Sequence, residues 1–182
     1  MLRNATPADF PAILQLNDES EHFLSPLTLP RLAEFHAWAT YHRVVVLDGG
    51  VVAFLLAFRQ GTKYDSPNYR WFAARYPRYL YIDRVAVSAT HRGNRYGALL
   101  YADLFSFARE SGAEWVVCEF DIDPPNEISR RFHARFGFLE VGTQWVAGDT
   151  KQVSLQEARL GRAGSRAALD GGHSQPIDAT RA

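Results

Sequence analysis

A short loop rich in glycine and arginine is the sequence feature that most constrains how this chain folds. It reads RGNRYGA over residues 92–98. The segment before it, residues 79–87 (YLYIDRVAV), is typical of a strand. After it, apolar residues recur at the three- and four-residue spacing of one helix face. The pattern therefore predicts a strand, a loop and a helix in direct succession.

The same arrangement predicts a phosphate site. The first backbone N–H groups of a helix have no intrahelical partner, and the helix dipole places partial positive charge there. Gly93 and Gly97 allow a ligand to approach the backbone closely, and Arg92 and Arg95 add positive charge. We expect Arg95 to have ordinary helical dihedral angles, with its side chain directed to a phosphate or to solvent.

The rest of the chain alternates between strand-like and helix-like segments and shows no internal repeat. Strands are predicted at residues 1–4, 43–47, 51–58, 79–87, 115–121, 139–146 and 151–157. Helices are predicted at residues 8–17 and 29–40, from the glycine-arginine loop to residue 111, and from residue 126 onward.

The last of these helices carries a second motif. It follows Pro124 and Pro125 and reads NEISRRFHARFGF over residues 126–138. Apolar residues recur every four positions from Ile128, and Gly137 stands where a helix often ends in a left-handed residue. The segment thus predicts a helix led by asparagine and closed by Gly-Phe.

The order of these elements resembles the GNAT superfamily of N-acetyltransferases, which transfer an acetyl group from acetyl-CoA to an amine. The family loop, R/Q-x-x-G-x-G/A, and its second motif are matched at Arg92, Gly97, Asn126, Phe132, Gly137 and Phe138. Two positions depart from the pattern: Arg95 replaces the inner glycine, and His133 replaces the usual tyrosine. Segments Y-I-D-R, C-E and P-P-N are similar to those of a poorly characterised bacterial branch.

The resemblance implies an α/β fold. Its mixed, mostly antiparallel central sheet would be splayed at the centre and flanked by helices. It covers residues 1–157, which we take as one acetyltransferase domain. Residues 158–182 are rich in Gly, Ala, Arg and Ser with hardly a large apolar side chain, so we expect a disordered tail.

The resemblance also implies acetyl-CoA as co-substrate and no metal. Backbone amides of Val85, Ala86 and Val87 would hold the acetyl group and the pantetheine arm. The pyrophosphate would lie on the loop residues Arg92, Gly93, Asn94, Arg95, Tyr96, Gly97 and Ala98. Asn126 and Phe132 would contact CoA, although Asn126 is also placed as an ordinary helix N-cap.

Two carboxylates are candidates for the base that an amine acceptor requires. An alkyl amine is mostly protonated at neutral pH, so a proton acceptor is needed. Glu119 lies in an apolar strand, at a position that resembles the acid of ribosomal-protein N-terminal acetyltransferases. Asp83 lies in the neighbouring strand, on the face of Val87 if the two-residue period holds. The structural alternative for either carboxylate is a salt bridge, with Arg84 or Arg131 as partner.

His133 stands where the family presents a tyrosine that protonates the departing thiolate. Imidazole titrates near neutrality, so the replacement is compatible with that acid role. The alternative is a packed helix residue. Cys118, the single cysteine, is expected to be a small buried side chain.

Residues 61–78 form a long connection with five large aromatic side chains. Long connections of this kind are usually functional or disordered, and aromatic richness argues against disorder. We expect either a lid or wall of the acceptor pocket, or a patch over the core or a dimer contact.

Composition narrows the partners. The formal net charge is zero without a concentrated basic block, so no nucleic acid is expected. The longest apolar run, residues 51–58, is too short for a membrane span, and one cysteine permits no internal disulfide. We expect a cytoplasmic protein that acts on a small-molecule or peptide amine, with a homodimer possible.

The favoured function is acetyl-CoA-dependent N-acetylation by direct attack in a ternary complex. The first alternative is a non-catalytic acyl-CoA-binding or regulatory module, because the usual tyrosine and inner glycine are both replaced. The second is a protein that binds another nucleotide on the Arg92 loop, although that loop lacks the Lys-Ser/Thr end of a P-loop.

Overall fold

A computed structural model describes residues 1–161 as one seven-stranded sheet with helices on both faces. The strands are β1 (Leu2–Asn4), β2 (Tyr41–Leu47), β3 (Gly50–Arg59), β4 (Tyr79–Val87), β5 (Trp115–Asp123), β6 (Leu139–Val146) and β7 (Lys151–Arg159). The helices are α1 (Phe10–Asp18), α2 (Leu29–Trp38), α3 (Pro67–Ala73), α4 (Tyr96–Glu110) and α5 (Glu127–Ala134), with single 3-10 turns at Pro7–Asp9 and Ala89–His91. None of these helices has the length and apolar character that a membrane crossing requires.

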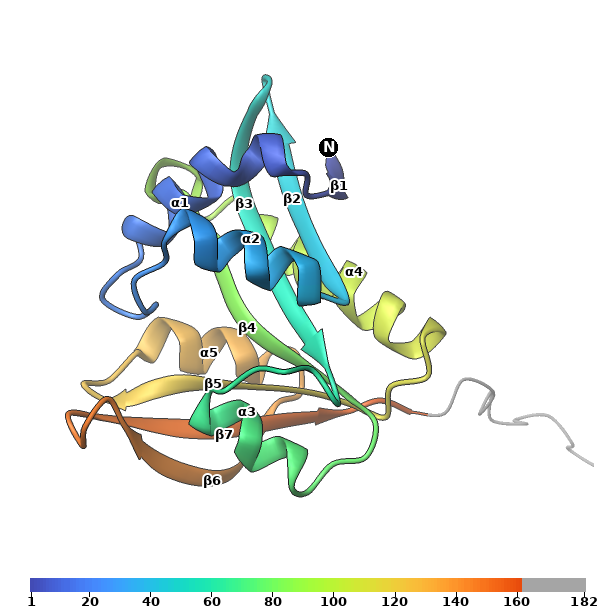
Figure 1. The fold of residues 1–182 in the computed structure, drawn as a ribbon, viewed down its shortest axis with the longest axis vertical. Helices are drawn as coiled ribbons and strands as arrows, with labels where there is room; N and C mark the ends of the chain where they lie inside the picture. The colour runs from blue at the N-terminus through green and yellow to red at the C-terminus, as the bar shows by residue number, and fades with distance from the viewer. Residues whose placement is uncertain (162–182) are drawn as a thin grey trace, which may run out of the picture.

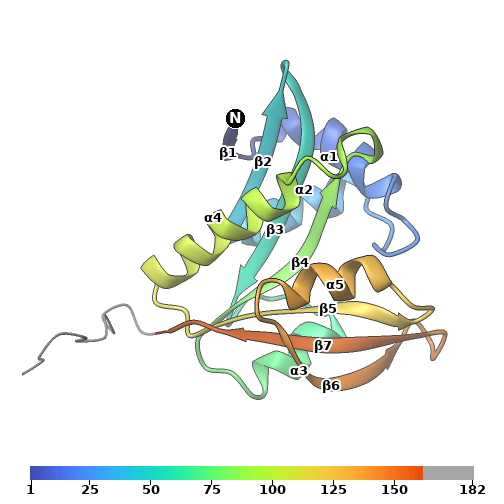
Figure 2. The ribbon, with the colours of Figure 1, turned by 180° about the vertical axis from the view of Figure 1, so that it is seen from behind.

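The sheet is mixed and mostly antiparallel, as expected. Its strand order is β1-β2-β3-β4-β5-β7-β6, and only β4 and β5 run parallel. The last hairpin folds back so that β7 lies between β5 and β6 (Figures 1 and 2). The asparagine-led helix α5 connects β5 to this hairpin.

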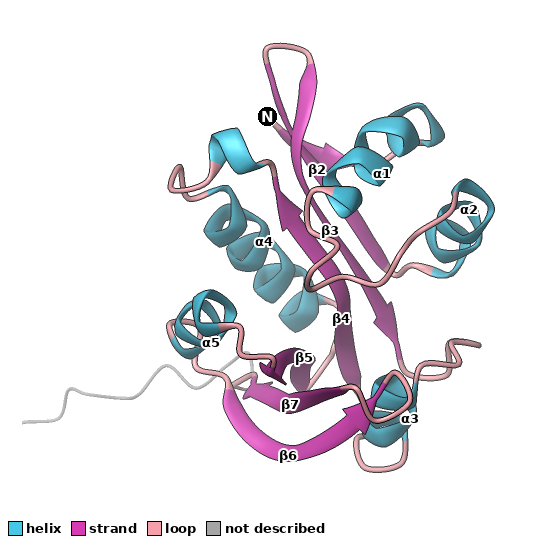
Figure 3. Cartoon of the chain, turned by 90° about the vertical axis from the view of Figure 1, so that its left-hand side faces the viewer, coloured by secondary structure: helices cyan, strands magenta, loops and turns pink. Residues whose placement is uncertain are grey.

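The helices form two layers, one on each face of the sheet (Figure 3). Helices α1, α2 and α3 bury apolar side chains against one face, where Phe35, Phe58 and Phe72 belong to one core cluster. Helix α4 covers the other face, where Leu100 and Leu104 belong to a second cluster. Both clusters bury large apolar side chains completely, which is the main source of the fold's stability.

The sheet opens at its centre, between β4 and β5. The two strands pair only at their first residues, from Tyr79↔Trp115 to Tyr81↔Val117. Beyond Tyr81 they diverge, so that the second halves of both strands face an opening and not each other (Figure 1). The expected central splay is therefore present.

Strand β4 carries a bulge where it begins to diverge. Consecutive residues of β3 pair with Ile82 and Arg84, which leaves Asp83 as the extra residue. The bulge shifts the alternation of side chains by one position. Asp83 consequently lies on the α1 and α2 face beside Tyr64, whereas Val87 packs on the α4 face. The expectation that Asp83 and Val87 share a face is wrong, because a two-residue period does not survive a bulge.

The domain ends later than the sequence pattern indicated. Strand β7 continues to Arg159, and Ala158 and Leu160 are both buried in the core. The boundary at residue 157 therefore falls inside the last strand. The sequence did not indicate this, because the small and isolated apolar residues at the end of β7 resemble the composition of the segment that follows. Of the tail, residues 162–182 lie outside the described residues.

The aromatic connection at residues 61–78 contains helix α3, which the sequence reading missed. Ser66 accepts a hydrogen bond from the backbone N–H of Tyr69, and Pro67 opens the helix, a common start. Tyr69 and Phe72 are buried in the core beneath the sheet. The packing alternative for this segment is therefore confirmed for these rings.

Candidate active site

The opening between β4 and β5 holds a cleft of about 470 Å³. Its walls come from both strands, from the N-terminal half of α4, from α5, and from the segment between α1 and α2. Nearly every candidate residue of the sequence analysis lines it: Asp83, Val85, Ala86, Val87, Arg92, Gly93, Arg95, Tyr96, Gly97, Ala98, Glu119, Asn126, Phe132 and His133. Asn94 is the exception, and its side chain donates to the carbonyl of His91 instead.

The N-terminus of α4 faces the cleft without a cap of its own. No side chain accepts a hydrogen bond there, and the first intrahelical bond of this helix runs from Leu99 N–H to the carbonyl of Arg95. The backbone N–H groups of Tyr96, Gly97 and Ala98 are therefore free to bind an anion. This geometry is what the glycine-arginine loop predicted.

Arg95 differs from expectation. It is the N-cap of α4 with φ 63° and ψ 13°, in the left-handed region, and not a residue with helical dihedral angles. A side chain in that region costs about 1–2 kcal/mol relative to glycine. The family's inner glycine meets this need, which explains why glycine is usual there. Gly93 in the same loop is also left-handed, at φ 84°.

Gly97 brings the loop close to the neighbouring elements. A Cβ atom on Gly97 would lie 3.4 Å from the ring of Phe132 and 3.8 Å from the side chain of Val87. Any larger side chain would have to enter the cleft or displace that ring. The loop, α5 and β4 thus form a narrow cradle at the arginine-rich end, and its donors and positive charges fit a pyrophosphate.

The N-terminus of α5 has a different character. The Asn126 side chain accepts a hydrogen bond of 3.0 Å from the backbone N–H of Ser129, so this helix is capped by its own residue. The N-cap alternative for Asn126 is therefore confirmed. Asn126 still lines the cleft.

The backbone N–H groups of β4 point alternately to β3 and to the cleft. The N–H of Ser88 donates to the carbonyl of Val52 on β3, and backbone groups alternate along an antiparallel pair. The amide of Ala86 consequently points to β3, which corrects the expectation for that residue. The amides of Val85 and Val87 point away from β3, toward the cleft.

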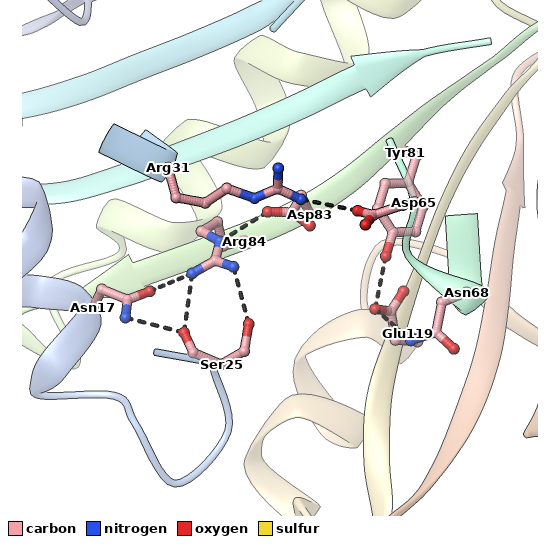
Figure 4. A network of polar contacts seen from close by, with 9 residues as sticks. All are labelled: Asn17, Ser25, Arg31, Asp65, Asn68, Tyr81, Asp83, Arg84 and Glu119. Carbon is pink, nitrogen blue, oxygen red and sulfur yellow. Dashed lines mark hydrogen bonds and ion pairs between the residues drawn. The ribbon is translucent and has the colours of Figure 1, made fainter. Parts of the chain in front are cut away.

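Glu119 lies beside the cleft with one oxygen fully engaged and the other free. Its Oε1 accepts hydrogen bonds from Tyr81 Oη (2.8 Å) and Asn68 Nδ2 (2.9 Å), whereas its buried Oε2 has no partner (Figure 4). Burial raises the pKa of Glu119 to about 8, the two hydrogen bonds oppose this rise, and the charges of Asp83 and Asp121 add to it. A carboxyl group with such a pKa can exchange a proton near neutral pH.

The other carboxylates of the cleft are paired. Asp83 accepts from Arg84 Nε at 2.8 Å, and both side chains are almost completely buried. Asp121 pairs with Lys151 at 3.1 Å. The salt bridge from Asp83 to Arg84, the structural alternative for Asp83, is thus present. Residues 1–161 contain no group of three or more His, Cys, Asp or Glu placed to bind a metal.

His133 is buried with both ring nitrogens engaged. Its Nδ1 lies 2.8 Å from the backbone oxygen of Ser129, and its Nε2 lies 2.9 Å from Tyr101 Oη. Since a backbone oxygen only accepts, Nδ1 carries the proton and Nε2 accepts from the tyrosine. Burial lowers the pKa of His133 to about 4. A neutral imidazole in this arrangement favours the packed-residue alternative over the acid.

Three residues of the site were missed in the sequence, Asn68, Tyr81 and Tyr101, and Arg84 was considered only as the salt-bridge partner of a carboxylate. Tyr81 and Arg84 lie in the segment YLYIDRVAV. Polar groups among the apolar residues of this segment indicated a site, but only Asp83 was predicted as a candidate. Asn68 and Tyr101 had no sequence signal. Asn68 reaches Glu119 from α3, and Tyr101 lines the cleft from α4.

The model of the acetyltransferase (GNAT) family matches residues 10–138. A sequence search of curated proteins found no match. Among solved structures, the ribosomal-protein-S18-alanine N-acetyltransferase from Escherichia coli superposes with a TM-score of 0.69 at 12% identity, covering 92% of this chain and 97% of that one.

Two further structures have the same fold. The ribosomal-protein-alanine N-acetyltransferase from Brucella melitensis has a TM-score of 0.64 at 25% identity, covering 88% of this chain and 99% of that one. Naa20 from Chaetomium thermophilum, solved with a bisubstrate analogue, has a TM-score of 0.72 at 17% identity, covering 88% and 86%. With the family model matching more than half of its length, this chain belongs to the GNAT acetyltransferase family.

Proposed function

We propose that this protein transfers the acetyl group of acetyl-CoA to an amine by direct attack in a ternary complex, with Glu119 as the general base. The observation that carries the proposal is Glu119, which lines the cleft, has a buried Oε2 without a hydrogen-bond partner, and has a pKa raised to about 8. Family membership supports acetyl transfer in general.

The chain's own groups fit acetyl-CoA. The free amides of Tyr96, Gly97 and Ala98, together with the charge of Arg92, would hold the pyrophosphate. The amides of Val85 and Val87 would hold the pantetheine arm and the acetyl oxygen, as donors fixed in the strand before the reaction. When bound, acetyl-CoA supplies the activated acetyl thioester.

Glu119 would take the proton that the attacking amine loses. Its Oε1 is held by Tyr81 and Asn68, so the free Oε2 keeps a fixed position. In its ionised form this oxygen accepts a proton from an amine directly or through water. About one tenth of the carboxyl groups are ionised one pH unit below the pKa, so activity should rise with pH through about 8.

The acceptor is an amine on a small molecule or a peptide. Two of the structural neighbours are named for acetylating a ribosomal protein on alanine, which makes a peptide N-terminus one member of this class. The bisubstrate analogue bound to Naa20 supports simultaneous binding of both substrates. A cytoplasmic location and a homodimer remain parts of the proposal.

One observation favours the alternative of a non-catalytic acyl-CoA-binding module. His133 stands at the tyrosine position but has no proton available for a thiolate, because its Nδ1–H donates to the backbone oxygen of Ser129 and its Nε2 accepts from Tyr101. We infer that His133 keeps the Tyr101 hydroxyl in place, and His133→Phe tests whether this role or the acid role is needed at all. A normal rate in that variant would show that neither the imidazole nor its hydrogen bond is needed.

A turnover assay across an amine panel distinguishes the two functions. Release of free CoA thiol from acetyl-CoA would be measured with small amines, amino acids and peptides, and the acetylated product identified by mass. We expect amine-dependent thiol release that rises with pH. Tight acetyl-CoA binding by calorimetry without turnover on any amine would favour the binding module.

A further inference from the structure

The segment between α1 and α2, residues 19–28, borders the cleft at the end that contains Glu119, and we refer to it as the strap. Ser20, Phe23 and Leu24 of the strap line the cleft. The strap contains no helix or strand. Its position therefore depends on the contacts that it makes with neighbouring elements.

The end of the strap next to α2 is held by a buried arginine on β4. Arg84 Nη1 donates to the backbone oxygen of Ser25 at 3.2 Å, and Nη2 donates to Ser25 Oγ at 3.0 Å (Figure 4). The same guanidinium binds Asn17 Oδ1 on α1 at 2.7 Å and Asp83 at 2.8 Å. Its side chain is 3% exposed, so water does not compete for these bonds.

The geometry of this contact requires arginine. One planar fork reaches three partners on β4, α1 and the strap, and Asn17 Nδ2 adds a bond of 3.2 Å to Ser25 O. The β4 bulge contributes to this contact, because it turns Asp83 and Arg84 to the same face of the sheet. A lysine carries three N–H donors on a single nitrogen, so it cannot make the four hydrogen bonds that the arginine fork makes from three separate nitrogens.

The middle of the strap is held by a weaker contact across the cleft. Lys151 Nζ, at the start of β7, donates to the backbone oxygen of His22 at 3.1 Å and pairs with Asp121 on β5. The lysine side chain is 32% exposed. Exposed ion pairs of this kind contribute little, because water and salt compete for the charges. At the start of the strap, Glu19 accepts a third, exposed hydrogen bond of 3.2 Å from the backbone N–H of Ala89. The strap thus has one buried polar attachment, at Ser25, and two exposed ones.

We propose that Arg84 is a positioning residue, which fixes the strap beside Glu119 and thereby sets the affinity of the acceptor end of the cleft. The effect on acceptor affinity rests on the proposed function, because that function defines the acceptor. The attachment of the strap by Arg84 does not depend on the proposed function. Arg84 acts through Ser25 and Asn17, since four of the five N–H donors of its guanidinium are engaged by Asp83, Asn17 and Ser25. The phosphate cradle at residues 92–98 has separate contacts and should be unaffected.

The test compares Arg84→Lys with Arg43→Lys on the full chain. Arg43 on β2 is the matched control, because it makes two bonds to one carboxylate, Asp103, at 2.7 and 2.8 Å and does not line the cleft. Hydrogen exchange of the strap amides would be measured by mass spectrometry, acetyl-CoA affinity by calorimetry, and kcat and KM for each substrate once an amine acceptor is known.

In Arg84→Lys we expect strap exchange about tenfold or more faster, with acetyl-CoA affinity within about twofold of the parent. The acceptor KM should rise about five- to tenfold, while kcat at saturation changes less. Ser25→Ala removes one acceptor and keeps the arginine fork, so it should give smaller changes in strap exchange and acceptor KM in the same direction. This variant replaces Arg84→Lys in the test if Arg84→Lys does not fold.

Unchanged strap exchange in both variants, or equal changes in the Arg43→Lys control, would overturn the proposal. So would faster exchange with an unaltered acceptor KM. Failure of every amine in the panel would count against the proposed function alone, because strap exchange and acetyl-CoA affinity still report on the role of Arg84.

Discussion

The two ends of the cleft are built in different ways. The phosphate end is one continuous stretch, residues 92–98, whose free amides belong to a single loop and the first turn of α4. The Glu119 end is assembled from α1, the strap, α3, β4 and β5 through side-chain hydrogen bonds. A local site depends on backbone conformation, whereas an assembled site depends on several packed elements at once. Substitutions at the two ends should therefore fail in different ways.

The largest effect is expected at the assembled end. Glu119→Gln should lower turnover by roughly 10²- to 10⁴-fold at neutral pH, because it removes the proton acceptor and keeps the side-chain size. Acetyl-CoA affinity should survive, and the defect should shrink at high pH, where the amine is already neutral. The measurement is a pH profile of kcat/KM for both proteins.

Glu157→Gln is a matched control for this variant. Glu157 on β7 also accepts a hydrogen bond from a tyrosine, Tyr76, but it does not line the cleft. Near-normal turnover is expected in the control. Near-normal turnover in Glu119→Gln itself would transfer the base role to Asp83 or to ordered water.

The next effect is expected at the local end. Gly97→Leu should weaken acetyl-CoA binding about 10- to 100-fold, since the new side chain would enter the cleft or displace Phe132, and each tenfold corresponds to about 1.4 kcal/mol. Calorimetric titration of the folded variant measures this. Ala102→Leu, on the exposed face of the same helix, controls for a leucine on α4 and should bind normally. Equal affinity in both variants would remove the loop from the CoA site.

A smaller effect concerns stability. The pKa of Glu119 is raised from its ordinary value near 4.5 to about 8 in the folded protein. Between these values the folded state binds a proton that the unfolded state has lost, so its contribution to stability is complete below pH 4.5 and is lost as pH rises through 8. Glutamine does not titrate.

The difference in unfolding free energy between Glu119→Gln and the parent should therefore change by about 1–2 kcal/mol in favour of the variant as pH rises from 5 to 9. This figure includes an allowance for solvent near the cleft. Urea titrations of both proteins at the two pH values give this difference. A constant difference would show that the carboxyl group titrates normally. The gain in stability alongside the loss of turnover would mark Glu119 as a functional residue.

The smallest effect returns to the loop. Arg95→Gly should raise the unfolding free energy by up to about 1 kcal/mol, because glycine relieves a left-handed backbone but loses more entropy on folding. Arg92→Gly is the comparison, since Arg92 has φ −63° and its backbone has no strain to relieve. A larger gain at position 92 than at 95 would contradict the backbone explanation.

Sequence alone was sufficient for the features that depend on neighbours along the chain. The strand at residues 79–87 has its predicted bounds, α4 begins inside the predicted loop, and Gly112 and Gly137 have the left-handed backbone expected after helices. The GNAT family and fold followed from the order of these elements, and the uncapped start of α4, where we propose that the pyrophosphate binds, followed from two glycines and a helix start. Periodicity, capping and turn propensity are local, so the sequence records them directly.

Only the tertiary structure decided the chemistry at the other end of the cleft. The bulge at Asp83 reversed the expected face of that carboxylate, and it arises from pairing with β3, which no local pattern records. Asn68 came to Glu119 from 51 residues away, and Arg84 came to Ser25 from 59. The pKa of Glu119 and the engaged nitrogens of His133 are likewise products of burial. Burial and long-range hydrogen bonds exist only after the elements pack, so the residue types were visible in the sequence but their partners were not.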